Sequence, residues 1–198
     1  MYRWFSLANV CCGAVCLSLL IGLSGCGRQT PTAPKASPTE AAQEAMRLYD
    51  QNADGKISGK ELDAVPAFQY VLTEMDTDKD KAISAPEIEA RIQKWIETDS
   101  SLVGASCKVT FNGKPVASGT LILEPEPFMG SAFSVGKGEI SDGICQPTTD
   151  NPGDYCAMPV GFYKARVEGA ASGSGGIEIY DRSIVYQKSG VFPIELGK

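Results

Sequence analysis

The 198-residue chain contains no histidine. Without an imidazole it has no Ser-His-Asp or Cys-His relay and no His-ligated zinc site, which excludes many catalytic and metal centres. An enzyme would have to use carboxylates, as glycosidases do, and Asp142 and Asp150 are the candidate pair for that role. Both lie among turn-forming residues, so solvated loop acids explain them better. We therefore predict a binding protein and no enzyme.

Basic residues are also few. The chain has 18 Lys+Arg against 24 Asp+Glu, for a net charge of −6. A nucleic-acid binder normally carries a basic patch, so this balance argues against nucleic acid as a partner. Much of the acidity lies in residues 37–99, which hold 14 acidic and 7 basic residues. That concentration indicates a specific use for the carboxylates of this segment.

An uncharged, mostly apolar stretch occupies residues 4–25. It ends in Leu23-Ser24-Gly25-Cys26, which resembles the bacterial lipobox, a cleavage site placed directly before an acylated cysteine. The resemblance implies removal of residues 1–25 and a lipid anchor on Cys26, and an uncleaved transmembrane helix is the alternative. Both place the rest of the chain outside the cytoplasm, in the cell envelope. The composition of residues 26–37, rich in Pro, Thr and Ala, is typical of a flexible tether.

Residues 50–61 form a twelve-residue segment with oxygen-bearing side chains at positions 1, 3, 5, 9 and 12. This spacing, with Gly55 at position 6, matches the EF-hand calcium loop. Calcium favours about six to eight oxygen ligands, and alternate side chains of such a loop converge on one point. The predicted ligands are Asp50, Asn52, Asp54, the backbone carbonyl of Lys56, Ser58 and Glu61.

A second copy begins 26 residues later, at Asp76. Its predicted ligands are Asp76, Asp78, Asp80, the backbone carbonyl of Ala82, Ser84 and Glu87. Lys81 stands where the EF-hand family has glycine, and a left-handed conformation costs a non-glycine residue roughly 1–2 kcal/mol. The four acidic ligands, one more than in the first loop, work in the opposite direction. We predict two Ca²⁺ sites, and the alternative is a pair of solvated acidic turns.

The residues around both loops have helical spacing. Ser37-Pro38-Thr39-Glu40 predicts a capping box at the start of the first helix. Ile57 and Ile83 are expected to meet in a short strand contact between the loops. Only 14 residues, Leu62–Met75, separate the loops, which predicts a very short helix after the first. We therefore expect an α-helical EF-hand pair over residues 38–99, in which calcium stabilises the structure rather than signals.

After Asp99 the pattern changes to short apolar alternations separated by Gly and Pro, which is typical of strands. Asn112-Gly113-Lys114-Pro115 predicts a hairpin that joins strands Cys107–Phe111 and Val116–Leu123. Further strands are expected at Phe133–Val135, Glu139–Ser141, Phe162–Val167 and Val191–Leu196. This spacing predicts a small antiparallel β-sandwich over residues 103–198. The predicted fold class is α+β with two domains, an α-helical EF-hand pair followed by this sandwich.

Several segments of the C-terminal part resemble carboxypeptidase regulatory-like, or transthyretin-like, domains. The matching segments are Val109–Val116, Gly119-Thr120, Leu123–Pro125, Pro159–Val167, Tyr186, Ser189–Val191 and Ile194–Leu196. Such domains are common in lipoproteins of planctomycete-type bacteria. The resemblance implies a β-sandwich that serves as an interaction module, and it implies no reaction because these are scaffold positions.

Three cysteines lie beyond Cys26, namely Cys107, Cys145 and Cys156. Outside the cytoplasm they allow three different single disulfides. Cys145 and Cys156 flank a loop of turn-forming residues and are the favoured pair, and buried free thiols are the alternative.

Together these features predict a calcium-binding, lipid-anchored envelope protein. Calcium would brace the EF-hand module, the lipid on Cys26 would hold the protein on the membrane, and the β-sandwich would contact an envelope protein. The alternative is a small-ligand carrier, with its site on the sandwich or in a cleft between the domains.

Overall fold

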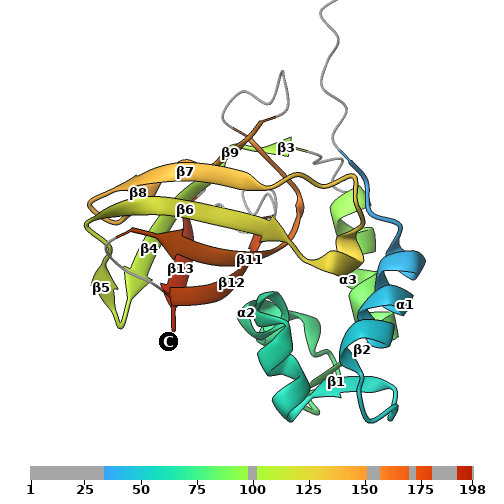
Figure 1. Ribbon diagram of the computed structural model, residues 1–198. Helices are drawn as coiled ribbons and strands as arrows, with labels where there is room; N and C mark the ends of the chain where they lie inside the picture. The colour runs from blue at the N-terminus through green and yellow to red at the C-terminus, as the bar shows by residue number, and fades with distance from the viewer. Residues whose placement is uncertain (1–33, 98–101, 151–156, 170–172, 180–190, 198) are drawn as a thin grey trace, which may run out of the picture.

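The computed structural model describes residues 34–97, 102–150, 157–169, 173–179 and 191–197. Figure 1 shows their arrangement, with the helices gathered at one end of a curled sheet. The predicted leader, Cys26 and most of the tether lie outside the described residues, and so do Cys156, Tyr186 and Ser189-Gly190. None of the described helices is long and apolar enough to cross a membrane.

The helical end of the molecule is built around two short strands. Its elements are α1 (Pro38–Tyr49), β1 (Lys56–Ser58), the 3₁₀ helix η1 (Gly59–Ala64), α2 (Pro66–Met75), β2 (Ala82–Ser84) and α3 (Ala85–Glu97). Proline opens α1 and α2, where its missing N–H costs no helical hydrogen bond. The side chain of Ser37 makes no cap hydrogen bond, so the capping box predicted there is wrong. A capping box does form at the start of η1, between Ser58 and Glu61.

Two predictions about this end are confirmed. β1 and β2 pair antiparallel, and Ile57 lies directly opposite Ile83 with both side chains fully buried. The helix after the first loop is the single 3₁₀ element η1, which ends at Ala64 because Val65 and Pro66 start the next helix. The two loops are therefore held side by side by a contact three residues long.

The rest of the described chain forms mainly one sheet of nine strands. Its longer strands are β4 (Ser106–Phe111), β6 (Ser118–Pro125), β7 (Gly136–Ser141), β11 (Gly161–Glu168), β12 (Gly173–Ile179) and β13 (Val191–Leu196). The short strands are β5 (Lys114–Pro115), β8 (Ile144–Cys145) and β9 (Thr148–Thr149). The order is β12-β11-β6-β7-β8-β4-β13, with β5 beside β4 and β9 beside β7. Only the β13–β4 pair is parallel among these strands.

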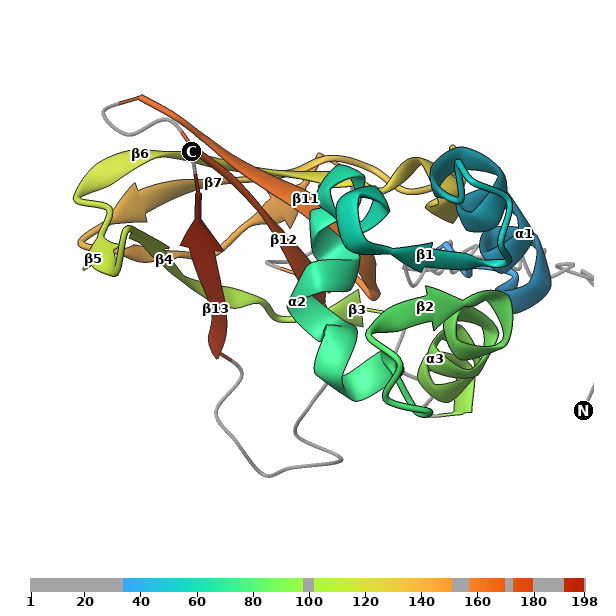
Figure 2. The same ribbon diagram turned by 90° about the horizontal axis from the view of Figure 1, so that it is seen from below.

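The sheet curls until its two ends meet, as Figure 2 shows for β12 and β13. Ser174 and Gly197 exchange two backbone hydrogen bonds, of 3.2 and 3.0 Å. We call this contact the seam. A Cβ atom on Gly175 would lie 2.6 Å from the carbonyl oxygen of Glu195, so the seam needs glycine at that position.

The observed strands differ from the predicted ones in three places. Asn112 and Gly113, both with positive φ, turn β4 back onto the two-residue β5, and β6 then leaves to pair with β7 and β11. The predicted turn at Asn112-Gly113 is therefore confirmed, but the hairpin that it closes joins β4 to β5 and not to the long strand β6. The expected strand Phe133–Val135 is irregular, and β12 was not predicted because its sequence Gly173-Ser174-Gly175-Gly176 looks like a loop.

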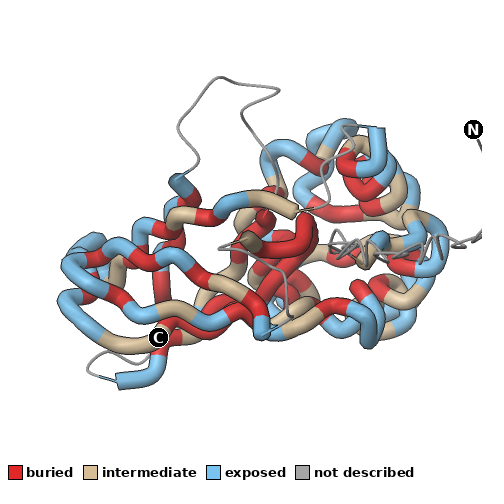
Figure 3. Tube along the Cα trace, turned by 90° about the horizontal axis from the view of Figure 1, so that it is seen from above, coloured by how far each residue is buried: buried red, intermediate tan, exposed pale blue. Residues whose placement is uncertain are grey.

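Three further short elements lie where the helical end meets the sheet. The 3₁₀ helix η2 (Pro127–Met129) follows β6, and the short strands β3 (Leu102–Val103) and β10 (Met158–Pro159) pair with each other. One apolar cluster contains helical residues together with Phe128, Met129, Phe133, Val160 and Phe162. Buried positions accordingly occur in both parts of the molecule in Figure 3. The sheet therefore supplies part of the core of the helical end.

The predicted fold class, an α-helical EF-hand pair followed by a small β-sandwich, is wrong. Among the described residues, strands account for 41% and helices for 31%, and most of the strands belong to one curled, largely antiparallel sheet. The physical reason is that the helices bury their apolar faces against the sheet as well as against each other. Gly176 makes this possible, because a Cβ there would lie 2.0 Å from the carbonyl carbon of Pro66 at the start of α2.

Candidate metal centre

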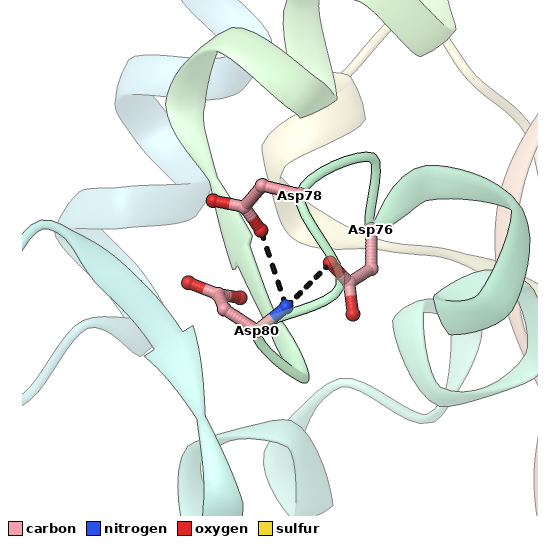
Figure 4. Close-up of side chains that lie close together, drawn as sticks. All are labelled: Asp76, Asp78 and Asp80. Atoms are coloured by element: carbon pink, nitrogen blue, oxygen red, sulfur yellow. Dashed lines mark hydrogen bonds between the residues drawn. The ribbon is translucent and has the colours of Figure 1, made fainter.

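Three carboxylates converge in the loop between α2 and β2. One ligand oxygen from each of Asp76, Asp78 and Asp80 lies within 4.8 Å of the others. The backbone N–H of Asp80 donates to Oδ1 of Asp76 at 3.1 Å and to Oδ1 of Asp78 at 3.2 Å, which holds the three side chains around one point (Figure 4). This cluster could hold a metal ion, as the sequence predicted.

Glu87, the predicted last ligand of this loop, lies in the first turn of α3. Its Oε1 accepts hydrogen bonds from the N–H and the hydroxyl of Thr77, at 2.8 and 3.0 Å, and its Oε2 accepts from the N–H and the hydroxyl of Ser84, at 2.9 and 2.8 Å. Burial alone would raise the pKa of Glu87, but these donors outweigh it and hold the pKa below its ordinary value. The carboxylate is therefore charged and ties the two ends of the loop together.

The first loop repeats the same framework. Asp50 accepts from the N–H of Gly55 at 3.0 Å, and Asp54 accepts from the N–H of Lys56 at 2.9 Å. The backbone N–H of Asp54 donates to Oδ1 of Asp50 at 3.2 Å and to Oδ1 of Asn52 at 2.9 Å, and the amide of Asn52 donates to the carboxylate of Asp54 at 2.9 Å. Glu61 accepts from Gln51 at one end of the loop (2.9 Å) and from Ser58 at the other (3.0 Å).

The predicted left-handed conformation at position 6 is confirmed in both loops. Gly55 has φ +84° and Lys81 has φ +66°. Position 4 is also left-handed, with φ +56° at Ala53 and +62° at Lys79, which sequence reasoning missed. Loop two therefore carries strain at two lysines, whereas loop one carries it at a single alanine.

Lys56 connects the two loops in a way that was not predicted. Its carbonyl is an expected ligand of the first loop, but its ammonium group pairs with Asp80 and lies 3.5 Å from Asp78 in the second. The hydrogen bond to Asp80 raises the pKa of Lys56 and lowers that of Asp80. An ammonium thus already faces the carboxylates that would receive a cation.

A buried charged cluster lies behind the second loop. Arg91 on α3 is 7% exposed, and its Nε donates to Oε1 of Glu178 on β12 at 2.6 Å, with a further bond to Oε2. Arg91 also donates to Glu74 on α2 at 2.7 Å, and Trp95 donates to Glu178 at 3.0 Å. Burial disfavours the guanidinium charge, but Glu178 and then Glu74 outweigh it, so the pKa of Arg91 is raised. An arginine within the apolar stripe of Ile88, Ile92 and Trp95 is the sequence signal that could have revealed this cluster.

The helix that enters the first loop also makes a partly buried polar contact with a distant part of the chain. The hydroxyl of Tyr49, at the end of α1, donates to Oε2 of Glu126 at 3.0 Å. Glu126 is 3% exposed, and its Oε1 is buried without a hydrogen-bond partner. Burial raises the pKa of Glu126 and also that of Tyr49. This contact was likewise not predicted.

The described cysteines are Cys107 and Cys145, which lie directly opposite each other on β4 and β8 as buried free thiols. Burial raises the pKa of both, to about 11 for Cys145. The favoured partner of Cys145, Cys156, lies outside the described residues, so that pairing stays a prediction.

A groove of about 750 Å³ runs between α2 and the seam. Its lining combines Tyr70 and Pro193 with Asp63, Gln69 and Glu195. This groove is the place where the alternative prediction, a small-ligand carrier, would apply.

Comparison of the chain with protein-family models, with curated proteins and with solved structures finds no match in any of the three.

Proposed function

We propose that the chain binds calcium at two loops of the EF-hand kind, and that the two ions brace the helical end against the sheet of a lipid-anchored envelope protein. The observation that carries the proposal is the convergence of Asp76, Asp78 and Asp80, with Glu87 bonded across the ends of the same loop. The first loop supports it by repeating the framework with Asp50, Asn52, Asp54 and Glu61.

The donor set favours calcium over other metals. All predicted ligands are oxygens of carboxylates, an amide, hydroxyls and backbone carbonyls, which suit hard cations. Magnesium usually keeps several waters and takes only one or two carboxylates. A loop with four carboxylates and a contributing carbonyl is better matched to the larger ion, which accepts more protein ligands.

The packing favours a bracing role over a sensor role. A sensor opens its helix pair to expose an apolar groove. Here Phe68 on α2 packs against Phe128 and Phe162, with ring centroids 5.1 and 5.3 Å apart, and Trp95 on α3 packs against Phe162 at 4.8 Å. Aromatic residues of the sheet and of η2 thus cover the apolar face that a sensor would expose.

Membrane anchoring rests on Leu23-Ser24-Gly25-Cys26 alone. A lipid on Cys26 would place the folded part outside the cytoplasm, and the sheet would be available to an envelope protein. Metabolic labelling with a radioactive fatty acid tests this: we expect label on the wild type and none on Cys26→Ala. Absence of label from the wild type would contradict the anchor.

The bracing role is tested by thermal unfolding of the full-length protein in detergent, with calcium or with a chelator. Calcium at 100 times its Kd should stabilise the protein by about 2.7 kcal/mol for each occupied site. The double variant Glu61→Gln/Glu87→Gln is the control, and its melting temperature should not respond to calcium. Calorimetric titration in parallel counts the bound ions. Calcium binding without any change in melting temperature would refute the brace but not the binding.

A further inference from the structure

We propose that Arg91 is a positioning residue for the second calcium loop, and that it makes calcium affinity at that loop dependent on the contact between α3 and the sheet. This inference rests on the proposed calcium function, and it identifies a residue that sets the calcium affinity of one of the two proposed sites.

The position of Arg91 relative to the loop is the first argument. Arg91 lies four residues after Glu87, on the same face of α3. Its partner Glu74 lies two residues before Asp76, at the end of α2. One guanidinium therefore joins the helix that enters the loop to the helix that leaves it, close to the first and the last ligand.

The second observation is the contact of Arg91 with Glu178 on strand β12, which anchors α3 to the sheet. Glu178 is fully buried on β12, and both of its oxygens accept hydrogen bonds from Arg91. A bidentate pair fixes the guanidinium in orientation as well as in distance. Trp95, one turn further along α3, donates to the same carboxylate and fixes a second point of the helix.

These contacts define the angle between α2 and α3 before any ion binds. With the angle fixed, Glu87 stays at the edge of the loop, and binding requires little rearrangement of the helices. Loss of the contact would let α3 move, and part of the binding free energy would then be spent on reordering it. Because coupling is reciprocal, calcium at this loop should also strengthen the contact with the sheet.

The first loop provides an internal comparison. The residue four positions after Glu61 is Val65, which is fully buried and cannot form an ion pair. Arg91 should therefore affect the second loop and leave the first unchanged. A general loss of stability would affect both.

The test measures calcium binding by calorimetry at one loop at a time. Glu61→Gln isolates the second loop, and Glu87→Gln isolates the first. Arg91→Lys keeps the charge but loses the planar fork, and we expect it to weaken calcium binding at the second loop about tenfold. Glu74→Gln removes only the ion pair between Arg91 and the partly exposed Glu74, so the fold should remain intact. It should weaken calcium binding at the second loop about threefold. Glu97→Gln, the same change at an exposed position of α3, is the control and should have no effect.

The outcomes separate the two proposals. If neither loop of the wild type binds calcium, the proposed function fails. If both loops bind but Arg91→Lys and Glu74→Gln leave the second-loop affinity unchanged, the function stands and the role of Arg91 is refuted. Equal weakening at both loops would also refute it, because a purely structural role predicts that result.

Discussion

The two loops share a ligand framework but differ in what surrounds it. Loop one has glycine at position 6, and the helix before it is tied by Tyr49 to the buried Glu126 at the start of η2, one of whose oxygens lacks a hydrogen-bond partner. Loop two has the strained Lys81 at position 6 and is tied by the bidentate pair of Arg91 and Glu178. The loop with the less favourable backbone thus has the stronger anchor. Under the proposed calcium function, we therefore expect affinity at each loop to depend on residues outside the ligand set as well as on the ligands.

The largest effect should come from the last ligand of each loop. Glu61→Gln should weaken calcium binding at loop one by about 100-fold or more, and Glu87→Gln should do the same at loop two, because each loses a bidentate carboxylate. Calorimetric titration should show one remaining site in each variant. If either variant still binds two ions as the wild type does, the corresponding loop is not a calcium site.

The next largest effect concerns position 6. It tests whether backbone strain causes a difference in calcium affinity between the two loops. Lys81→Gly removes a left-handed lysine and should tighten loop two about tenfold, the equivalent of roughly 1–2 kcal/mol. Lys81→Gln is the matched control, since it removes the charge and keeps the strain. Equal tightening by both variants would show that charge, and not backbone conformation, limits this loop.

A smaller effect should appear in the free energy of unfolding when the weaker anchor is changed. Because the pKa of Glu126 is raised in the folded state, its contribution to stability is present at low pH and is lost as pH rises through that pKa. Glu126→Gln should therefore stabilise the protein increasingly, by up to about 1 kcal/mol, as pH is raised from 4 to 8, because the neutral amide avoids the cost of ionising a buried carboxyl group. Urea unfolding at both pH values measures the difference.

The control for this prediction is Tyr49→Phe, which removes the hydroxyl donor and leaves the carboxylate in place. It should destabilise the protein more as pH rises, because ionisation of Glu126 increases the need of the carboxylate for a donor. A Glu126→Gln effect of the same size at both pH values would mean that ionisation of Glu126 is not involved.

The smallest effect should come from Lys56, the side chain that reaches from one loop to the other. Lys56→Met removes an ammonium that competes with a cation for Asp78 and Asp80, and should tighten loop two about twofold, since the pair is exposed to solvent. Lys60→Met, the same change at an exposed position of η1, is the control. Weaker binding at loop two in Lys56→Met would show that the ammonium supports the loop and does not compete with the ion.

The loops could be predicted from the sequence because their information is local. Twelve consecutive residues determine which side chains converge, and the left-handed residue at position 6, the pairing of Ile57 with Ile83 and the short helix η1 follow from the same spacing. Strands β4, β11 and β13 were also found, because each alternates apolar and polar residues or carries a strong apolar run.

The anchors and the fold class could not be predicted in this way because they join distant residues. Arg91 and Glu178 are 87 positions apart, and Tyr49 and Glu126 are 77 apart, so no short-range pattern marks them. The glycine-rich β12 has the composition of a linker, yet it completes the sheet and supplies the surface on which α2 rests. Without that strand, a small sandwich beside a separate helical pair was the natural expectation.

The seam has a consequence for how the protein behaves at high concentration. β12 and β13 lie at the two ends of the strand order, where a sheet normally presents unpaired backbone groups that recruit strands of other molecules. The two hydrogen bonds between Ser174 and Gly197 turn these ends toward each other. A side chain at Gly175 would press against Glu195 and separate them. The segment that looks most like a dispensable linker thus helps protect the protein from edge-to-edge aggregation.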